Sequence, residues 1–345
     1  MSEGLAPEAA LDRCHWVKLI CGASNQDLAA IEDLSGIFTL AGVHCIDAAA
    51  DPAVVSAIRR GMAWAGARGA GRPWLMLSLS DGVDPHFRKA WFNPHLCPAR
   101  CSRPCERVCP ALAIGVVVTG VGGVLAERCY GCGRCLPACP HGLIEERGQV
   151  LPGAAVAPLL AQLRPDAVEL HTQPGRAQAF RTRVDQLVAS GIPLRRVAVS
   201  AGLEGTAQSA PELAGELWQR FAVLRSQGLR PLWQLDGRPM TGDVGAGTAA
   251  AAVRLAAAVL PLAPPGPVQL AGGTNAQTLL HLRGRPALRG QIAGVAFGGV
   301  ARRLLQPFLL EAQRRGRPLL ADGVLWPQAL QLAQGLVHPW LEQQL

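Results

Sequence analysis

Short apolar runs alternate with longer amphipathic segments along most of the chain. Each run is rich in Val, Ile, Leu and Ala and predicts a buried strand, whereas each longer segment repeats its apolar residues at helical spacing and predicts a helix. Capping and turn residues separate the two kinds of segment, as at Gly42, Asp51 and Pro52. We expect strands at 17–21, 44–48, 74–79, 167–171, 196–200, 231–235, 268–271 and 292–297.

The segments between these strands predict helices at 26–40, 52–65, 154–163, 176–189, 210–227, 248–260, 275–282 and 300–315. Pro307 predicts a kink in the last of these, and a final packing helix and tail follow in 327–345. A series of strand–helix units favours an α/β fold of the (β/α)8 barrel type. An open, doubly wound α/β sheet is the alternative that the same pattern permits.

The alternation breaks after the third expected strand, where a cysteine-rich segment precedes the next helix. We expect residues 1–91 to form the first part of the barrel, 92–147 an inserted ferredoxin-like domain, and 148–345 the remainder of the barrel with a C-terminal helix. An insert of this size needs bound metal to hold it together. Because it interrupts a connection that follows a strand, the insert should lie at the barrel mouth, where such folds carry their active sites.

Eight of the eleven cysteines lie in this segment, and they form two sets. The second set has the spacing C-x2-C-x2-C-x3-C-P that is typical of bacterial ferredoxins with two [4Fe–4S] clusters, in which the fourth cysteine serves the other cluster. The crossed pattern assigns Cys97, Cys101, Cys105 and Cys139 to one cluster and Cys109, Cys129, Cys132 and Cys135 to the other.

The first cysteine set is less regular, because its gaps are three residues long where two are expected. The exact ligation of Cys97 and Cys101 therefore stays open. A single cluster and a structural zinc site are alternatives, although zinc does not explain the ferredoxin spacing. Disulfides are disfavoured because residues 1–13 do not resemble a secretory signal.

Composition and charge narrow the class of protein further. The chain is 49% apolar and 17% charged, which permits a large core, and its net charge is +8. Two four-thiolate clusters of about −2 each would reduce this charge to about +4. The arginines are scattered, so we expect no nucleic-acid partner. We also expect no membrane span and a cytoplasmic location.

Two glycine pairs, Gly272-Gly273 and Gly298-Gly299, follow the last two expected strands. Barrels often bind phosphate with these loops, and a flavin mononucleotide (FMN) would suit such a site. The alternative is that the glycines only serve tight turns that need positive φ. The glycine-rich loop at 236–248 is interpreted as facing a ligand or as a structural turn.

Polar residues near the strand ends predict either a ligand pocket or a hydrogen-bonded interior without a ligand. They are Cys45, Asp47, Glu169, His171, Gln234, Asp236 and Gln269. No nucleophile–base pair can be identified from spacing, so no catalytic residue is assigned. Cys14, Cys21 and Cys45 are expected to be buried and inert, with a redox-active thiol as the alternative. Arg302, Arg303, Arg314 and Arg315 are interpreted as a solvated helix face.

Several stretches together resemble the cyanobacterial light-dependent period family. They are KLICGASNQD at 18–27, CIDAAADP at 45–52, the cysteine segment at 97–140, DGRPM at 236–240 and QLAGGTN at 269–275. The resemblance implies an iron–sulfur protein that relays photosynthetic redox state to the circadian clock through clock-associated proteins. The alternative is an oxidoreductase in which the ferredoxin-like insert serves a flavin or another small-molecule ligand in the barrel mouth.

Overall fold

Eight parallel strands close into a barrel in this computed structural model, which describes residues 5–116, 122–148, 150–203, 207–240 and 243–342. The barrel is complete because β1 pairs with both β2 and β12, so the predicted barrel is confirmed and an open sheet is wrong. Around the barrel the strands are β1 (Trp16–Gly22), β12 (Gly294–Phe297), β11 (Val268–Ala271), β10 (Pro231–Asp236), β9 (Arg196–Ala201), β8 (Ala167–His171), β3 (Trp74–Ser80) and β2 (Cys45–Ala49).

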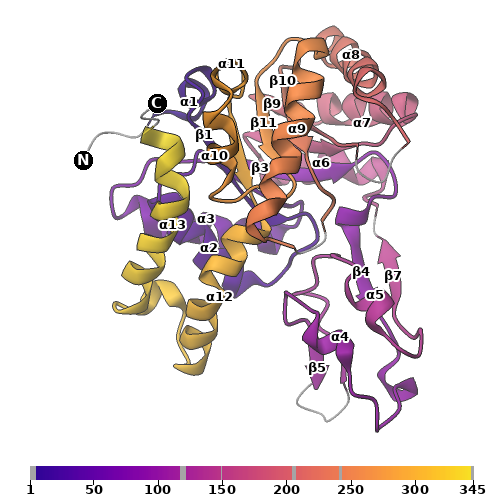
Figure 1. Ribbon diagram of the computed structural model, residues 1–345, viewed down its shortest axis with the longest axis vertical. Coiled ribbons are helices and arrows are strands. Elements are labelled where there is room, and N and C mark those ends of the chain that lie inside the picture. Colours follow the sequence, from indigo (N-terminus) through magenta and orange to yellow (C-terminus); the bar gives the residue numbers. More distant parts are fainter. Residues whose placement is uncertain (1–4, 117–121, 149, 204–206, 241–242, 343–345) are drawn as a thin grey trace.

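Helices surround this barrel in the order that the sequence pattern predicts (Figure 1). Asp51 caps one of them by accepting hydrogen bonds from the Ala53 and Val54 N–H groups at 2.8 and 3.1 Å. The outer helices are α2 (Leu28–Leu40), α3 (Pro52–Gly66), α6 (Gly153–Leu163), α7 (Ala177–Ala189), α8 (Ala210–Ser226), α9 (Ala249–Val259), α10 (Thr278–Arg283) and α12 (Gly299–Arg314).

Further elements complete the barrel. The final helix α13 (Leu325–Glu342) packs against α2 and α12. The short helices α1 (Pro7–Asp12) and α11 (Pro286–Arg289) were not expected from the sequence pattern. Short 3-10 turns occur at η3 (Ala246–Thr248), η4 (Leu260–Leu262) and η5 (Leu319–Ala321). No helix in the described ranges combines the length and apolarity that a membrane crossing requires.

The two faces of the strands carry different kinds of side chains. Outward-facing residues such as Val17 and Leu19 pack under the helices in one large apolar core. The inward-facing residues form layers, as in other barrels. The layer nearest the N-terminal ends of the strands is apolar and contains Trp16, Cys45 and Met76. Lys18, two residues after Trp16, is fully buried and begins a polar layer nearer the mouth.

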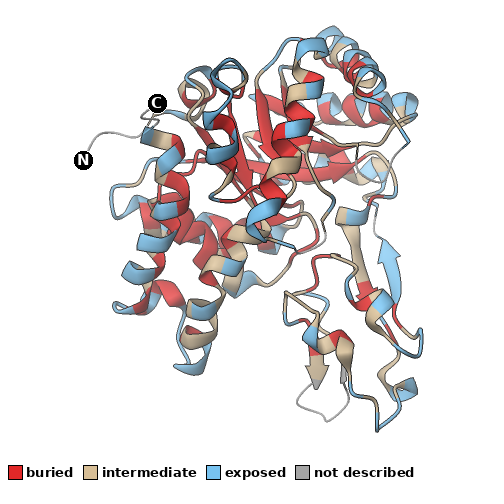
Figure 2. Cartoon of the chain, in the orientation of Figure 1, coloured by how far each residue is buried: buried red, intermediate tan, exposed pale blue. Residues whose placement is uncertain are grey.

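The cysteine-rich insert leaves the barrel after β3 and projects from it (Figure 1). Its two ends pair as antiparallel strands β4 (Arg88–Trp91) and β7 (Glu145–Gly148). A second small pair joins β5 (Ile114–Val116) to β6 (Gly122–Val124). Buried residues are concentrated in the barrel and sparse in the insert (Figure 2). Its remaining elements are η1 (Pro85–Phe87), η2 (Pro94–Leu96), α4 (Pro104–Arg107) and α5 (Cys135–Ala138).

Candidate functional site

The cysteines of the insert lie in two neighbourhoods. Burial raises the pKa of the Cys135 thiol to about 12, and the adjacent thiols of Cys132, Cys129 and Cys109 add to the shift. Around Cys97, burial again raises the thiol pKa, and Cys101 and Cys139 are among the groups that raise it further. Burial likewise raises the pKa of the Cys105 thiol, and Cys139 is among the neighbours that raise it further. The fold therefore brings together Cys109 with the second cysteine set, and Cys139 with the first.

Backbone N–H groups point at several of these sulfurs. The Ala113 N–H donates to Cys109 Sγ at 3.2 Å, and the Ala90 N–H donates to Cys129 Sγ at 3.3 Å. Burial acts to raise the pKa of Cys139, but the backbone N–H groups of the four residues 141–144 outweigh burial and lower it. Ala113 and Leu143 each lie four residues after a C-P cysteine, so the two halves repeat the same turn. Such hydrogen bonds stabilise thiolate and tune a cluster's potential.

Tyr130, between two cysteines of the second set, joins the insert to the barrel. The Arg302 guanidinium lies over the Tyr130 ring, 4.2 Å from its centroid, and its Nη2 donates to the Cys21 carbonyl oxygen at 2.8 Å. Gly131 has φ of +78°, and a Cβ there would lie 2.4 Å from the Arg88 carbonyl oxygen, so only glycine fits this turn. The interpretation of Arg302 as a solvated residue is therefore wrong, whereas Arg303 is exposed.

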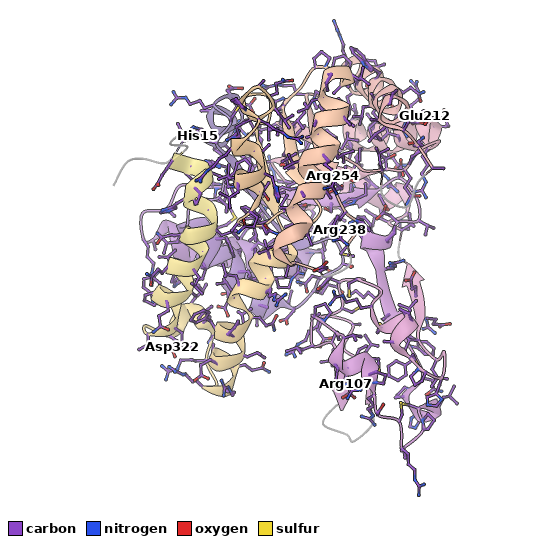
Figure 3. All side chains as sticks on the ribbon, in the orientation of Figure 1. His15, Arg107, Glu212, Arg238, Arg254 and Asp322 are labelled. Atoms are coloured by element: carbon purple, nitrogen blue, oxygen red, sulfur yellow. The ribbon has the colours of Figure 1, made fainter. Side chains whose placement is uncertain are left out.

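A cavity with about 860 Å³ of empty space, partly open to solvent, opens at the C-terminal ends of the strands. Tyr130 of the insert lines it together with Arg238 and Arg302 of the barrel. Figure 3 labels Arg238 at the end of the barrel that faces the insert. Of the residues expected at the mouth, the structure places Asp47, Glu169, His171, Gln234, Asp236, Gly272, Gly273, Gly298 and Gly299 on the cavity wall.

The two glycine pairs line the cavity for different structural reasons. Gly272 and Gly273 have φ of +66° and +91°, and a Cβ on Gly272 would lie 2.5 Å from the Arg238 carbonyl oxygen. A tight turn alone is therefore enough to require glycine at this pair. Gly298 has φ of −113° and immediately precedes α12, so the first N–H groups of a long helix point toward the mouth. The second pair is the better candidate for an anion.

A buried charged cluster forms the floor of the cavity. Lys18 Nζ lies 3.1 Å from Asp47 Oδ2 and also contacts Glu169 Oε2. Burial acts to lower the pKa of Lys18, but the Asp47 and Glu169 carboxylates outweigh it and raise the pKa, so the ammonium stays charged. Lys18 was not predicted from the sequence to belong to this site. Its position in the strand could have identified it, because Lys18 is two residues from both Trp16 and Ile20 and so shares the inward face of β1 with them.

Amide side chains connect this charged cluster to Trp16 in the apolar layer below it. Gln234 Nε2 donates to Glu169 Oε1 at 2.8 Å, and Gln269 Nε2 donates to Gln234 Oε1 at 2.8 Å. Trp16 Nε1 completes the chain by donating to Gln269 Oε1 at 2.7 Å. Gln269 therefore belongs to a hydrogen-bonded interior below the cavity, and Cys45 packs in the apolar layer rather than in the polar pocket. Burial raises the pKa of the Cys21 thiol to about 12, which suits an inert cysteine. Cys14 is only half-buried, so the expectation that it is buried is wrong.

Two acid–base groups border the upper part of the cavity. Burial and the Glu169 carboxylate raise the pKa of Asp236 to about 7. Burial and the neighbouring His86 lower the pKa of His171 to about 3. The His86 and His171 rings lie 4.6 Å apart between centroids, and sequence reasoning missed His86 because it stands outside the strand pattern. These shifts give the mouth a carboxyl group that titrates near neutral pH and a neutral imidazole.

Two solved structures are distantly similar to this chain. The carboxyl transferase domain of pyruvate carboxylase from Rhizobium etli matches with a TM-score of 0.46 and 12% identity, over 99% of this chain and 52% of that chain. Deoxyribose phosphate aldolase from Aeropyrum pernix matches with a TM-score of 0.41 and 12% identity, over 88% of this chain and 96% of that chain. Neither likeness bears on the function of this chain.

Family models match two regions of the sequence. Residues 97–150 match the Fe-S cluster-binding domain of the light dependent period A family, and residues 159–339 match the C-terminal domain of that family. The iron-sulfur subunit of an arsenate respiratory reductase from Shewanella sp. (strain ANA-3) is 26% identical over 102 residues, 26% of this chain and 43% of that protein.

A similar protein is known along nearly the whole length of the chain. Light dependent period A from Synechococcus elongatus is 45% identical over 338 residues, which cover 96% of this chain and 93% of that protein. The resemblance noted in the sequence is therefore confirmed over both the barrel and the insert. Together with the cysteine neighbourhoods and the barrel, these matches show that the chain belongs to the light dependent period A family and is an iron–sulfur protein.

Proposed function

We propose that this chain is a cytoplasmic redox sensor that holds two [4Fe–4S] clusters and passes their redox state to partner proteins. One cluster would be held by Cys97, Cys101, Cys105 and Cys139, and the other by Cys109, Cys129, Cys132 and Cys135. When bound, a cluster supplies one-electron chemistry and changes its charge by one on reduction.

The grouping of the eight thiols is the observation that carries this proposal. Each group draws three cysteines from one set and a C-P cysteine from the other, as the crossed ferredoxin pattern requires. Four adjacent thiols repel one another as thiolates unless a shared cation compensates their charge. Backbone N–H groups donate to the sulfurs of Cys109 and Cys129, and such hydrogen bonds lower the pKa of the Cys139 thiol.

Tyr130 and Arg302 supply a route from the insert to the barrel. Tyr130 lies between Cys129 and Cys132 in sequence and touches Arg302, which in turn holds the end of β1 through Cys21. A change of charge beside Tyr130 would alter its contact with the cationic Arg302. Such a contact can shift the balance between two arrangements of the insert.

Partner proteins would bind the insert. Leu96 and Leu112 are exposed to 62% and 43%, and Trp91 to 40%, which gives a partner apolar side chains to contact. The resemblance to the light-dependent period family indicates that these partners are clock-associated proteins. The scattered arginines give no support to nucleic-acid binding.

The test is anaerobic purification followed by iron and sulfide analysis and a reductive titration read by electron paramagnetic resonance. Two clusters predict about eight iron atoms per chain. Cys132→Ser should remove the signal of one cluster and Cys105→Ser that of the other, and Cys14→Ser, outside both groups, should remove neither. A folded protein that is iron-poor, or spectra that do not respond to either variant, would contradict the proposal.

A second candidate function is an oxidoreductase with a phosphate-bearing ligand, such as FMN, in the barrel mouth. The observation that favours it is the cavity that Tyr130, Arg302 and the α12 N-terminus share. Arg302 Nε is buried and has no hydrogen-bond partner among the described residues, so an anion there would satisfy it. Flavin absorption that survives removal of iron would support this function. Added FMN that binds wild type and Arg302→Ala equally, or not at all, would contradict it.

A further inference from the structure

Asp84, His86 and His171 gather at the edge of the barrel mouth, away from the cysteines. Asp84 and His86 lie in the loop after β3, and His171 ends β8. One nitrogen of each histidine and one oxygen of the carboxylate lie within 4.8 Å of one another. Two imidazoles and a carboxylate are a common ligand set for divalent transition metals, and they leave coordination positions open.

His171 has one ring nitrogen whose hydrogen-bonding capacity its protein neighbours leave unused. Its Nε2 lies 3.3 Å from Glu169 Oε1 and 3.3 Å from Ser78 Oγ, which fixes the ring from below. Its Nδ1, on the opposite side of the ring, is buried and has no hydrogen-bond partner among the described residues. The residue is only 5% exposed, so bulk water does not satisfy this nitrogen.

The environment of His171 is the one found around metal-bound histidines. A ligand histidine usually gives its other N–H to a carboxylate, which fixes the ring and makes the free nitrogen a better donor. Glu169 is placed for that role. Phe87 packs edge-on against the His171 ring at 5.3 Å between centroids and limits its rotation. The ring is therefore held in place beside the His86 ring, 4.6 Å away between centroids.

Asp84 is held from its other side as well. Its Oδ1 accepts the His86 backbone N–H at 2.9 Å and lies 2.8 Å from the His86 ring nitrogen Nδ1. Its Oδ2 is 3.4 Å from Gln173 Nε2. An Asp–His ion pair accounts for these contacts of Asp84 and His86, but it leaves His171 Nδ1 unsatisfied. A ligand bound by all three side chains would satisfy that atom.

A second turn in the insert shows what the local sequence does without the third ligand. Asn93-Pro94-His95 forms a 3-10 turn like Asp84-Pro85-His86, and Asn93 Oδ1 accepts the His95 N–H at 3.1 Å. His95 is exposed and lies in no cluster of this kind among the described residues. The turn is thus a common local motif, and the position of His171 is what makes the first copy different.

We infer that Asp84, His86 and His171 form a binding site for a divalent transition-metal ion, separate from the cluster cysteines. Coordination positions left open would face the two cavities that these residues border, one at the mouth and one lined by Thr172, Ser200 and Arg220. Nearby Glu169 and Asp236 carboxylates would offset the charge of the ion. The inference does not depend on the proposed sensor function.

The test uses zinc as the probe and protein that retains its iron. Anaerobically purified protein is dialysed against buffered free Zn²⁺, and zinc and iron are measured in the same sample. We expect one zinc ion per chain with unchanged iron content. His86→Gln and Asp84→Asn should each weaken zinc binding at least ~10-fold. Asp84→Asn keeps the oxygen that accepts the His86 N–H, so the turn is retained.

His95→Gln is the matched control, because it changes the same residue type in the same turn without the third ligand. It should bind zinc as the wild type does. Zinc K-edge absorption should show nitrogen and oxygen neighbours at about 2.0–2.1 Å and no sulfur at about 2.3 Å. Sulfur neighbours, equal affinity in all four proteins, or no zinc at all would overturn the site. Low iron with normal zinc would instead count against the clusters.

Discussion

The barrel and the insert are stabilised in opposite ways. The barrel buries a continuous apolar core between its strands and helices, and its charged interior groups are paired with one another. The insert buries only a few apolar side chains, such as Phe92, Ile114 and Ile144, and the other buried members of its core include cysteines. Every residue of β7 is exposed. Hydrophobic burial therefore suffices to stabilise the barrel, whereas the small core of the insert leads us to expect that its folding depends on bound metal.

Removal of iron should produce the largest difference between the two regions. Without the clusters, amide hydrogen exchange across residues 88–148 should rise by about 100-fold or more, while the barrel strands stay protected. Cys135→Ser should reproduce part of this effect, and Cys14→Ser, in the barrel, should not. Hydrogen exchange read by mass spectrometry checks it. If the amides of the insert stay protected from exchange without iron, the insert and the barrel do not differ in how they are stabilised.

Lys18→Met should destabilise the barrel by about 3–5 kcal/mol, because it leaves the Asp47 and Glu169 carboxylates buried without their cation. Urea unfolding followed by tryptophan fluorescence measures the change, and iron content should be unaffected. The double variant Lys18→Met/Glu169→Gln should recover part of the loss, since it removes one uncompensated charge. If the double variant loses as much stability as the two single variants lose together, the uncompensated charge is not the cause.

Acid should weaken the barrel through His44. Burial lowers the pKa of this side chain to about 4, and its Nδ1 accepts the Val17 N–H at 3.1 Å. The unfolded chain, with a pKa near 6.5, binds the proton more tightly. The stability from neutral His44 is therefore full above pH 6.5 and is lost as pH falls toward 4, by up to about 3 kcal/mol.

The His44 prediction is checked by urea unfolding between pH 7 and pH 4. His44→Asn keeps a hydrogen-bond acceptor near the Nδ1 position but removes the titration, so its stability should fall less steeply with pH than that of the wild type. His281→Asn, an exposed position in α10, should follow the wild type. Parallel curves for the His44 variant and the wild type would show that another group is responsible.

Arg302→Ala should have the smallest effect, because it breaks only the contact between the two regions. Loss of the ring contact with Tyr130 and the hydrogen bond to Cys21 should cost about 1–2 kcal/mol. Exchange should rise around residues 129–132 and remain unchanged in the barrel strands. Arg303→Ala, the exposed neighbour, should change neither region. Equal effects of the two variants would show that Arg302 does not join insert to barrel.

The sequence pattern predicted the strands well but the mouth less completely. The eight strands and the cap at Asp51 follow from local apolar runs and capping residues, which need no tertiary information. His86 and Arg302 were missed or misinterpreted, because each acquires its role from a residue far away in the chain. Arg302 sits on an amphipathic helix like any surface arginine, and only the position of Tyr130 makes it a contact.

The barrel and the two cysteine sets could be predicted from the chain alone, because apolar periodicity and ligand spacing are local properties. The folded arrangement was needed to show that Lys18 lies between two carboxylates, that Tyr130 lines the cavity, and that His171 lies near Asp84 and His86. The reason is geometric. Closing a barrel places the ends of distant strands side by side, and a single sequence carries no record of those distances.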